Sequence, residues 1–366
     1  MKVGVNYPWL NYGWDFGMPP TGWGSGSDPD WMDRIDSDLA HFKRIGISVV
    51  RWFILGDGLT YGTASDGPRF NQDTRQWNFN PPHLSEEFLA HFEALLERFQ
   101  ASNATAPPHV LLMPVFVDYL FCKPGVPALT GMCPDPGFIK QGRAQAINDS
   151  TKQADFLQRA LQPLLQIAAE YRPTIYAWDL INEPEWVTNN WHCDGDTGSH
   201  TIDEEAMRAF LQDGKTMIRR FDFKSTVGFW SIETIRRTNI DADINQFHFY
   251  SNPDPKKQRR LEEHSFSPEF PGIIGEFASA AAKDHWPDLK SQPQTVLNRL
   301  NCIASKNYPL ALVWSFHPGS GGDAFSHWGP HVDRDIVCFV FGRNCTQKRD
   351  AVRRRSPAQR RDSRLT

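Results

Sequence analysis

The sequence predicts an α/β protein, a (β/α)₈ TIM barrel with long loops on the C-terminal face. Eight short runs rich in apolar and β-branched residues alternate with amphipathic stretches, which is typical of parallel strands joined by crossover helices. Several runs are almost entirely apolar, as expected of strands that are buried on both faces. Two runs far apart in the chain end in a glutamate, which places a carboxyl group on the rim where such barrels carry their functional residues.

The predicted elements follow one another in strict alternation. Strands are predicted over residues 2–7, 48–55, 109–117, 174–181, 225–230, 245–250, 272–277 and 309–316. Apolar residues at three- and four-residue spacing predict helices over residues 35–45, 86–99, 153–171, 204–221 and 294–305. The fifth and sixth crossovers look short or irregular, and no convincing closing helix follows the eighth strand.

A single domain is predicted over residues 1–342, followed by a basic tail over residues 343–366. The chain of 366 residues has no internal repeat and no linker before the tail, and barrels with inserted loops reach this length as one unit. The tail carries nine Lys or Arg and two Asp, a net charge of +7, so the total of −4 leaves −11 for the body. We expect a disordered tail and assign it no function.

The acidic body bears on possible partners and on location. Nucleic acid or an anionic membrane would require a basic face, so neither is an expected partner, and we expect a monomer. No apolar run approaches the roughly 20 residues that span a bilayer. The chain begins directly on a predicted strand, without the regions of a signal peptide. We expect a cytoplasmic protein if this N-terminus is native, and a secreted one if a signal peptide was trimmed.

The cysteines give no indication of a metal site. Their spacing contains no CxxC pair and matches no zinc site; they are Cys122, Cys133, Cys193, Cys302, Cys338 and Cys345. Free thiols are expected, with a bridge between Cys122 and Cys133 as the alternative in an oxidising compartment. Residues 192–196 lack the full ligand pattern of a calcium loop. Neither a metal nor another cofactor is predicted.

Four long segments follow the first four predicted strands, over residues 8–29, 56–82, 118–142 and 185–199. All four belong to the C-terminal face, where loops of this length are usually functional or disordered. Trp residues lie along them, among them Trp9, Trp14, Trp23, Trp186 and Trp191. Indole rings stack on the flat C–H faces of sugars, so these residues indicate a carbohydrate-binding surface. Pinning of the loops to the barrel is the alternative for each one.

The two terminal glutamates belong to separate motifs. Asn182-Glu183-Pro184 follows the fourth predicted strand, and Glu276 follows Gly275 near the end of the seventh. With the order of the strands, these motifs resemble the retaining glycoside hydrolases of clan A, and most of all glycoside hydrolase family 5, the cellulase and mannanase family. The resemblance covers residues 1–330.

The resemblance implies a role for each matching residue. Glu183 matches the acid/base and Glu276 the nucleophile. Arg51, on the second strand, matches the arginine that holds the nucleophile. His248 and Tyr250, on the sixth strand, match a His-x-Tyr pair that lines the catalytic subsite, with a structural histidine of the barrel as the alternative for His248.

Further residues are expected to contact the sugar. Trp314 on the eighth strand matches the platform under the sugar that is cleaved, with a place in the barrel core as the alternative. Asn182 is expected to reach the sugar 2-hydroxyl, with capping of a strand-to-loop junction as its alternative. Trp9 and Trp186 are predicted to bind substrate from the loops. Three other acidic residues near strand ends are expected to be structural: Asp179, Glu185 and Glu233.

The chemistry of a retaining mechanism gives these residues a physical reason. One carboxylate attacks the anomeric carbon while the other protonates the departing oxygen, which requires the two groups about 5 to 5.5 Å apart. The nucleophile must be ionised and the acid protonated, so their environments must differ. We expect Arg51 and the Tyr250 hydroxyl to stabilise charge on Glu276, while Glu183 keeps its proton.

The sequence therefore predicts a retaining β-glycosidase that hydrolyses β-linked gluco- or manno-type oligosaccharides or glycosides through a covalent glycosyl-enzyme intermediate. Two alternatives use the same site: an endo-acting β-glucanase or mannanase, and a transglycosylase. A third alternative is a catalytically silent carbohydrate-binding barrel. The presence of both glutamates together with Arg51, His248 and Tyr250 favours an enzyme over the silent barrel.

Overall fold

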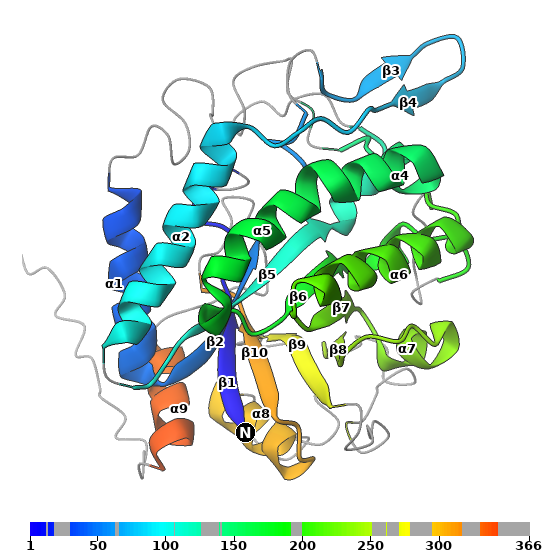
Figure 1. The fold of residues 1–366 in the computed structure, drawn as a ribbon. Coiled ribbons are helices and arrows are strands. Elements are labelled where there is room, and N and C mark those ends of the chain that lie inside the picture. The colour runs from blue at the N-terminus through cyan, green and yellow to red at the C-terminus, as the bar shows by residue number, and fades with distance from the viewer. Residues whose placement is uncertain are drawn as a thin grey trace, which may run out of the picture.

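The computed structural model describes residues 1–11, 14–17, 30–62, 66–105, 107–125, 139, 141–191, 200–250, 261, 271–278, 295–316 and 330–342. Within them, eight parallel strands close into a barrel in the order β1-β10-β9-β8-β7-β6-β5-β2, which confirms the predicted (β/α)₈ fold (Figure 1). The strands are β1 (Lys2–Asn6), β2 (Ile47–Phe53), β5 (Leu111–Asp118), β6 (Trp178–Asn182), β7 (Ser225–Phe229), β8 (Ile244–His248), β9 (Gly272–Ala278) and β10 (Leu310–Trp314).

Helices cover the outside of the barrel, and α2 packs between α1 and α5 (Figure 1). The helices are α1 (Trp31–Ile45), α2 (Glu86–Ala104), α3 (Gln145–Asn148), α4 (Ser150–Phe156), α5 (Gln162–Glu170), α6 (Glu204–Arg220), α7 (Ile232–Thr238), α8 (Val296–Ser305) and α9 (Pro330–Phe341). Short helical turns are η3 (Tyr119–Cys122), η4 (Leu157–Leu161), η5 (Arg172–Thr174) and η6 (Pro184–Trp186). The predicted helix over residues 153–171 corresponds to α4 and α5, joined by the π-helical turn η4.

Local sequence signals set the ends of the helices. α2 begins after Ser85, whose side chain accepts a hydrogen bond from the backbone N–H of Phe88, and two glutamates in its first turn suit the helix dipole. α1 ends at Gly46, which has a φ of 88° and supplies the left-handed conformation of a helix C-cap. The short α7 agrees with the expected short fifth crossover.

The prediction that no convincing closing helix follows the eighth strand is wrong. α9 packs against α1, α8 and β1, and it buries Val332 and Ile336 one helical turn apart. Charged residues between these two positions interrupt the apolar pattern in the sequence, and one of them, Asp335, is itself buried in the structure. A helix therefore follows the eighth strand and belongs to the outer layer.

The long segment after β2 contains regular structure that the sequence analysis did not predict. β3 (Arg69–Asn71) and β4 (Gln76–Asn78) pair as an antiparallel hairpin. The other long segments, over residues 8–29, 118–142 and 185–199, lie partly outside the described residues. Wholly outside them lie Trp23, Cys133, Cys193, Cys345, residues 192–196 and the tail over residues 343–366.

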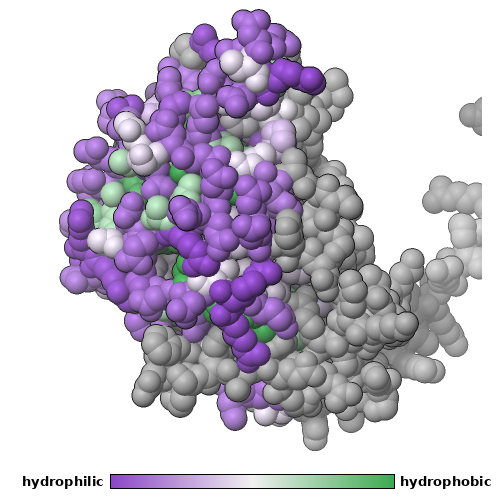
Figure 2. All heavy atoms as spheres, turned by 90° about the vertical axis from the view of Figure 1, so that its right-hand side faces the viewer, coloured by the Kyte–Doolittle hydropathy of each residue, from purple (hydrophilic) through white to green (hydrophobic). Residues whose placement is uncertain are grey.

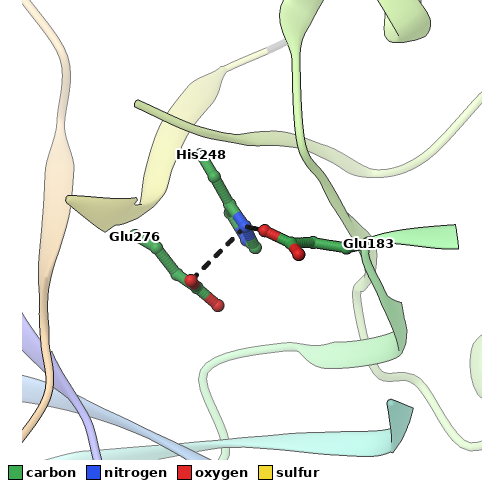
Figure 3. Close-up of side chains that lie close together, drawn as sticks. All are labelled: Glu183, His248 and Glu276. Carbon is green, nitrogen blue, oxygen red and sulfur yellow. Dashed lines mark hydrogen bonds and ion pairs between the residues drawn. The ribbon is translucent and has the colours of Figure 1, made fainter. Parts of the chain in front are cut away.

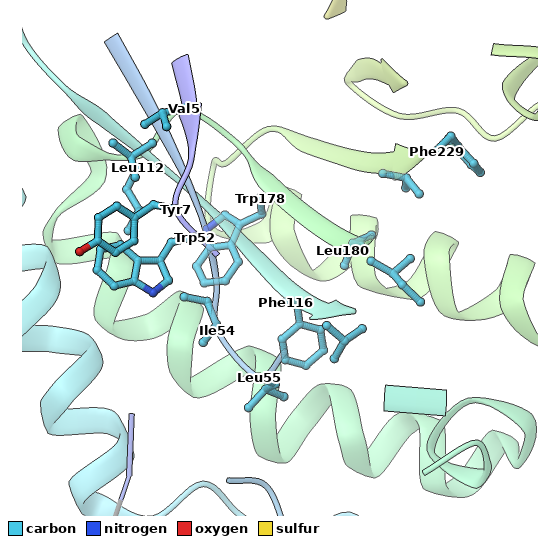
Figure 4. Packing of buried hydrophobic residues seen from close by; sticks show 14 of the residues in the cluster. Val5, Tyr7, Trp52, Ile54, Leu55, Leu112, Phe116, Trp178, Leu180 and Phe229 are labelled. Carbon is cyan, nitrogen blue, oxygen red and sulfur yellow. The ribbon is translucent and has the colours of Figure 1, made fainter. Parts of the chain in front are cut away.

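Apolar side chains fill the space between the strands and the helices (Figure 4). Tyr7, which follows β1, stacks on Trp52 of β2 with ring centroids 4.1 Å apart. A second, smaller cluster is made of seven buried residues around the barrel, two of them on β10: Val49, Met113, Ala177, Ile244, Ile273, Leu310 and Leu312. Strand alternation points these side chains into the barrel at its N-terminal end, so this end is closed by an apolar layer.

The thiols divide into two kinds. Cys122 and Cys302 are free and buried, so the alternative bridge from Cys122 to Cys133 does not form. Burial raises the pKa of the Cys122 thiol. Cys338 is disulfide-bonded.

The described surface carries few large apolar side chains. Figure 2 shows the side that lies to the right in Figure 1, where the described residues are mostly hydrophilic and apolar ones form small separate groups. Among the described residues, the exposed large apolar side chains are those of Met1, Phe70, Val340 and Phe341. No helix within the described ranges is both long enough and apolar enough to cross a membrane.

Candidate active site

The interior of the barrel changes from apolar to polar toward its C-terminal end. Along β2, Val49 belongs to the apolar layer and Arg51 follows two residues later, pointing the same way. Along β8, Ile244 belongs to that layer, and Gln246 and His248 follow at the same spacing. The polar side chains therefore stack above the apolar layer, directly below the rim.

The first polar level is a buried ion pair between Arg51 and Asp179. Nε and Nη2 of Arg51 lie 2.9 and 2.8 Å from Oδ2 of Asp179, and both side chains are fully buried. Gln246 donates to the same oxygen at 2.8 Å. A Cβ at position 228 would lie 2.7 Å from Arg51 and 3.0 Å from Asp179, so Gly228 leaves the space that this pair occupies.

Glu276 lies above this level at a break in strand register. The pairing of β8 with β9 shifts before His248, which is paired with Glu276, and such an irregularity redirects side chains. Oε1 of Glu276 accepts from Nη1 of Arg51 at 2.7 Å, and Oε2 accepts from the Tyr250 hydroxyl at 2.8 Å. Asn6 accepts from the same Arg51 nitrogen at 2.9 Å. A cation and a hydroxyl thus hold both oxygens of Glu276.

Glu183 directly follows β6 and faces Glu276 from the other side of the barrel. Its φ of 48° is left-handed, a conformation uncommon for a residue with a side chain and often found at functional sites. Oε1 of Glu183 lies 2.6 Å from Nδ1 of His248, and Oε2 accepts from the indole N–H of Trp186 at 2.9 Å. The indole of Trp186 is neutral, and the imidazole of His248 is neutral when it is not protonated.

The imidazole of His248 lies between the two glutamates (Figure 3). Nδ1 of His248 is 2.6 Å from Glu183 and 3.5 Å from Oε2 of Glu276. Burial lowers the pKa of His248 to about 4, so the ring is neutral near pH 7. Side-chain atoms of the three residues lie within 4.8 Å of one another, so an oxygen of Glu183 lies within 4.8 Å of one of Glu276.

Burial raises the pKa of both glutamates. The pKa of Glu183 rises to about 7, because desolvation outweighs the N–H of Trp186 and the charges of Arg51 and Lys123. Desolvation also raises the pKa of Glu276, and the charge of Glu183 adds to this rise, whereas His248, Arg51 and the Tyr250 hydroxyl act to lower it. Of the two carboxyl groups, Glu276 has the direct cationic partner, as expected from the sequence.

Asn182, the last residue of β6, links the two levels. Its Oδ1 accepts from Nη2 of Arg51 at 2.8 Å, and its Nδ2 donates to Oδ2 of Asp118 at 2.8 Å. Both residues of this second pair are buried. Burial raises the pKa of Asp118 to about 7 and that of the nearby Glu185 to about 8.

Aromatic rings flank the carboxyl groups on both sides. On the side of β2 and β10, Phe53 contacts both Trp9 and Trp314 edge to face, with ring centroids 6.4 and 6.3 Å away. On the side of β7 and β8, Trp230 contacts Trp186 at 5.5 Å and stacks on Tyr250 at 5.5 Å. Trp9, Trp186 and Trp314 are each partly exposed, as binding residues require.

Among the described residues, the structure brings together the site residues predicted from the sequence except for the two loop residues Trp14 and Trp191, which are 1% exposed, while Trp23 lies outside the described residues. It also adds residues that sequence reasoning missed: Asn6, Asp118, Trp230 and Gln246. Each lies at or near the C-terminal half of a strand, which is the one signal that marks them in the sequence. Asp179 lies deeper than Glu183, as expected.

The group of Glu183, His248 and Glu276 also has the spacing of metal ligands. The carboxyl oxygens of the group are already engaged, because Arg51 and Tyr250 hold Glu276 while Trp186 and His248 hold Glu183. The guanidinium in contact with Glu276 would also repel a divalent cation. These residues fit a pair of reacting carboxyl groups better than a metal site.

Comparison with known proteins finds neighbours in fold. No family model matches the sequence, and neither does any curated protein. A β-mannanase from the blue mussel Mytilus edulis matches with 16% identity and a TM-score of 0.63, over 94% of this chain and 92% of that chain. A β-1,4-D-mannanase from Cryptopygus antarcticus matches with 20% identity and a TM-score of 0.59, over 92% of this chain and 89% of that chain.

A broad-specificity endoglucanase labelled GH5-4, from an uncultured bacterium, matches with 12% identity and a TM-score of 0.50, over 92% of this chain and 93% of that chain. At such identities these likenesses show the fold. They extend over nearly the whole chain, and they agree with the resemblance to glycoside hydrolase family 5 drawn from the motifs.

Proposed function

We propose that this chain is a retaining β-glycosidase that hydrolyses β-linked gluco- or manno-type oligosaccharides or glycosides. The observation that carries the proposal is the pair of buried carboxyl groups of Glu183 and Glu276, with oxygens within 4.8 Å of each other on the rim of the barrel. Retaining enzymes hold their two carboxyl groups about 5 to 5.5 Å apart, whereas inverting enzymes leave about 6.5 to 9.5 Å for a water.

In the first step, a carboxylate oxygen of Glu276 attacks the anomeric carbon and forms a bond to it. The bond from that carbon to the glycosidic oxygen breaks, and this oxygen takes the proton of Glu183 as the alcohol departs. Arg51 and Tyr250 keep Glu276 ionised by their contacts of 2.7 and 2.8 Å. Glu183 carries its proton up to neutral pH because burial raises its pKa to about 7.

In the second step, Glu183 acts as the base. Glu276 is now an ester without charge, so the negative charge that favoured protonation of Glu183 is gone and the pKa of Glu183 falls. Glu183 takes a proton from water, the water oxygen bonds to the anomeric carbon, and the bond to Glu276 breaks. Both groups return to their starting states, and the sugar keeps its β configuration.

Two observations support a β-linked hexose polymer or its fragments as the substrate. Half-buried aromatic rings on both sides of the carboxyl groups suit the stacking of sugar rings. The neighbours in fold from M. edulis and C. antarcticus are named as mannanases, which places manno-oligosaccharides beside gluco-oligosaccharides among the substrates to test.

The test has two parts. Aryl β-glucosides, aryl β-mannosides and β-1,4-linked gluco- and manno-oligosaccharides are incubated with the parent chain, and products are followed by chromatography and by NMR of the anomeric proton. Separately, the protein is treated with 2-deoxy-2-fluoro glycosides of both sugars and analysed by peptide mass spectrometry. We expect cleavage of one sugar type with a β product, and a covalent label on Glu276.

Other outcomes contradict the proposal in distinct ways. Folded protein that binds oligosaccharides but neither cleaves them nor takes up the label would be a silent carbohydrate-binding barrel. An α-configured first product would indicate inversion. A label on a residue other than Glu276 would leave a glycosidase with a different nucleophile.

A further inference from the structure

Asp118 is a buried acid next to the proposed catalytic centre that the mechanism above does not use. It is the last residue of β5 and is 8% exposed. Its two oxygens accept hydrogen bonds in different directions. Oδ1 accepts from the backbone N–H of Leu120 at 2.8 Å, and Oδ2 accepts from Nδ2 of Asn182 at 2.8 Å.

The bond to Asp118 fixes the orientation of the Asn182 amide. On its other side, the amide oxygen accepts from Nη2 of Arg51 at 2.8 Å. A flipped amide would turn its NH₂ toward the guanidinium and its oxygen toward the carboxylate, so both contacts would become unfavourable. Asn182 is therefore held in one orientation between a cation and an acid.

The same amide has one N–H left over. An amide NH₂ has two donors, and within the described residues Asn182 uses one of them, toward Asp118. Asn182 immediately precedes Glu183 in the chain, and the charge of Glu183 raises the pKa of Asp118, the hydrogen-bond partner of the amide. The amide therefore belongs to the same part of the rim as the carboxyl group proposed as the acid/base. A buried N–H without a partner is costly, and a hydroxyl of a bound sugar would satisfy it.

We propose that Asp118 is a positioning residue that holds the Asn182 amide so that its remaining N–H meets the sugar 2-hydroxyl. This inference rests on the glycosidase function proposed above. The contact to the 2-hydroxyl strengthens in the transition state of glycoside hydrolysis, so its alignment affects the rate of the chemical step more than the binding of substrate.

A purely structural role for Asp118 predicts that its variants lose activity equally on a glycoside and on its 2-deoxy analogue. The bond to Leu120 closes a two-residue turn at the start of η3, and this turn is useful to the fold whether or not a sugar binds. Asp57 provides a natural control for that role. It is 7% exposed and accepts from the backbone N–H of Leu59, also two residues further on.

Two variants separate the two bonds of Asp118. Asp118→Asn has one oxygen and one NH₂, so it can accept from Leu120 or from Asn182 but not from both. Asp118→Ser keeps an oxygen that can close the turn to Leu120 but is too short to reach Asn182. If Asp118→Asn does not fold, Asp118→Ser still removes the bond to Asn182.

The experiment compares kcat/KM for an aryl β-glycoside and for its 2-deoxy analogue in the parent, Asp118→Asn, Asp118→Ser and Asp57→Asn. The 2-deoxy sugar is the same for the gluco and manno series, so the comparison does not depend on which sugar the enzyme prefers. We expect both Asp118 variants to lower the ratio of the two values about tenfold, through kcat rather than KM. Asp57→Asn is expected to keep the parent ratio.

The outcomes also separate this inference from the proposed function. Equal losses on both substrates in the Asp118 variants, or an equal change of the ratio in Asp57→Asn, would overturn the role of Asp118 and leave the glycosidase standing. A folded parent chain that cleaves no glycoside and takes up no fluoro-sugar label overturns the glycosidase, and the inference with it.

Discussion

Glu183 and Glu276 lie at the same depth of one barrel, yet the structure holds them by different kinds of group. Glu276 contacts a guanidinium and a phenol hydroxyl, from β2 and from the end of β8. Glu183 contacts an indole N–H and a neutral imidazole. Burial raises the pKa of both, so burial alone does not distinguish them. We propose that the difference in contacts favours the ionised form of Glu276 and the protonated form of Glu183.

The comparison extends one level deeper. Arg51 does not serve Glu276 alone, because Asp179 holds Nε and Nη2 of the same guanidinium. The positive charge of Arg51 is thus shared between two carboxylates. It stabilises the ionised form of Glu276 without neutralising the whole charge of that carboxylate. A carboxylate bound too strongly by a cation would be a poorer nucleophile, so the sharing suits a group that must stay both ionised and reactive.

The largest expected effect comes from removing each carboxyl group in turn. Glu276→Gln removes the attacking oxygen, and we expect a loss of about 10⁴-fold or more in kcat on every substrate. Glu183→Gln removes a proton donor, and we expect a loss of about 10²- to 10⁴-fold on poor leaving groups. For that variant, the first step should recover on an activated dinitrophenyl glycoside, which needs no protonation. Kinetics on a series of aryl glycosides of different leaving-group pKa test this.

The contrast between the two glutamates is contradicted if the activity of Glu276→Gln, rather than that of Glu183→Gln, depends on the leaving group. Recovery of Glu276→Gln on activated substrates, with none for Glu183→Gln, would exchange the two roles. Circular dichroism of each variant is the control for folding.

The next largest effect is expected on the free energy of unfolding. Arg51→Met leaves Asp179 and Glu276 buried without their cation, and we expect a loss of about 3 to 5 kcal/mol in the free energy of unfolding. Urea unfolding measures it. The matched control is Arg98→Met, which breaks the exposed pair of Arg98 with Asp36 and should cost at most about 1 kcal/mol. Equal losses in the two variants would show that the buried ion pair contributes no more to the free energy of unfolding than the exposed one.

A smaller effect is expected from Tyr250→Phe, which removes only the hydroxyl 2.8 Å from Glu276. A hydrogen bond to a charged group contributes about 1.5 to 3 kcal/mol, so kcat should fall about 10- to 100-fold. The hydroxyl lowers the pKa of Glu276, so its loss raises that pKa and moves the acidic limb of the pH–rate profile to higher pH. A shift of the alkaline limb instead would place the hydroxyl with Glu183.

Local pattern explains how much of this molecule could be predicted from the sequence. Each of the eight strands is a short apolar run. Glu183 directly follows β6 and Glu276 lies near the C-terminal end of β9, so the strand pattern predicts both residues near the rim. The closing helix α9 was missed because charged residues interrupt its apolar face, and one of these, Asp335, is buried only through tertiary contacts.

Contacts made across the barrel could not be predicted in the same way. The place of Glu276 depends on a shift in strand register, and the bond from Asp118 to Asn182 joins residues 64 positions apart. Trp186 was predicted to bind sugar because it lies in a loop, but nothing in its sequence neighbourhood indicates that its N–H reaches the carboxyl group of Glu183, three residues before it.

That N–H is the basis of the smallest effect we predict. Trp186→Phe keeps an aromatic ring but removes the donor 2.9 Å from Oε2 of Glu183, which lowers the pKa of that carboxyl group. Without it the pKa should rise above about 7, and the alkaline limb of the pH–rate profile should move to higher pH by up to about one unit, or 1.36 kcal/mol. The acidic limb should not move, because Trp186 makes no contact with Glu276. The full pH profile of kcat/KM for Trp186→Phe, measured beside that of Tyr250→Phe, tests both the expected shift of the alkaline limb and the expected constancy of the acidic limb. If the two variants move the same limb, the two glutamates are not held independently, and the contrast between a charged and a neutral environment does not set their roles.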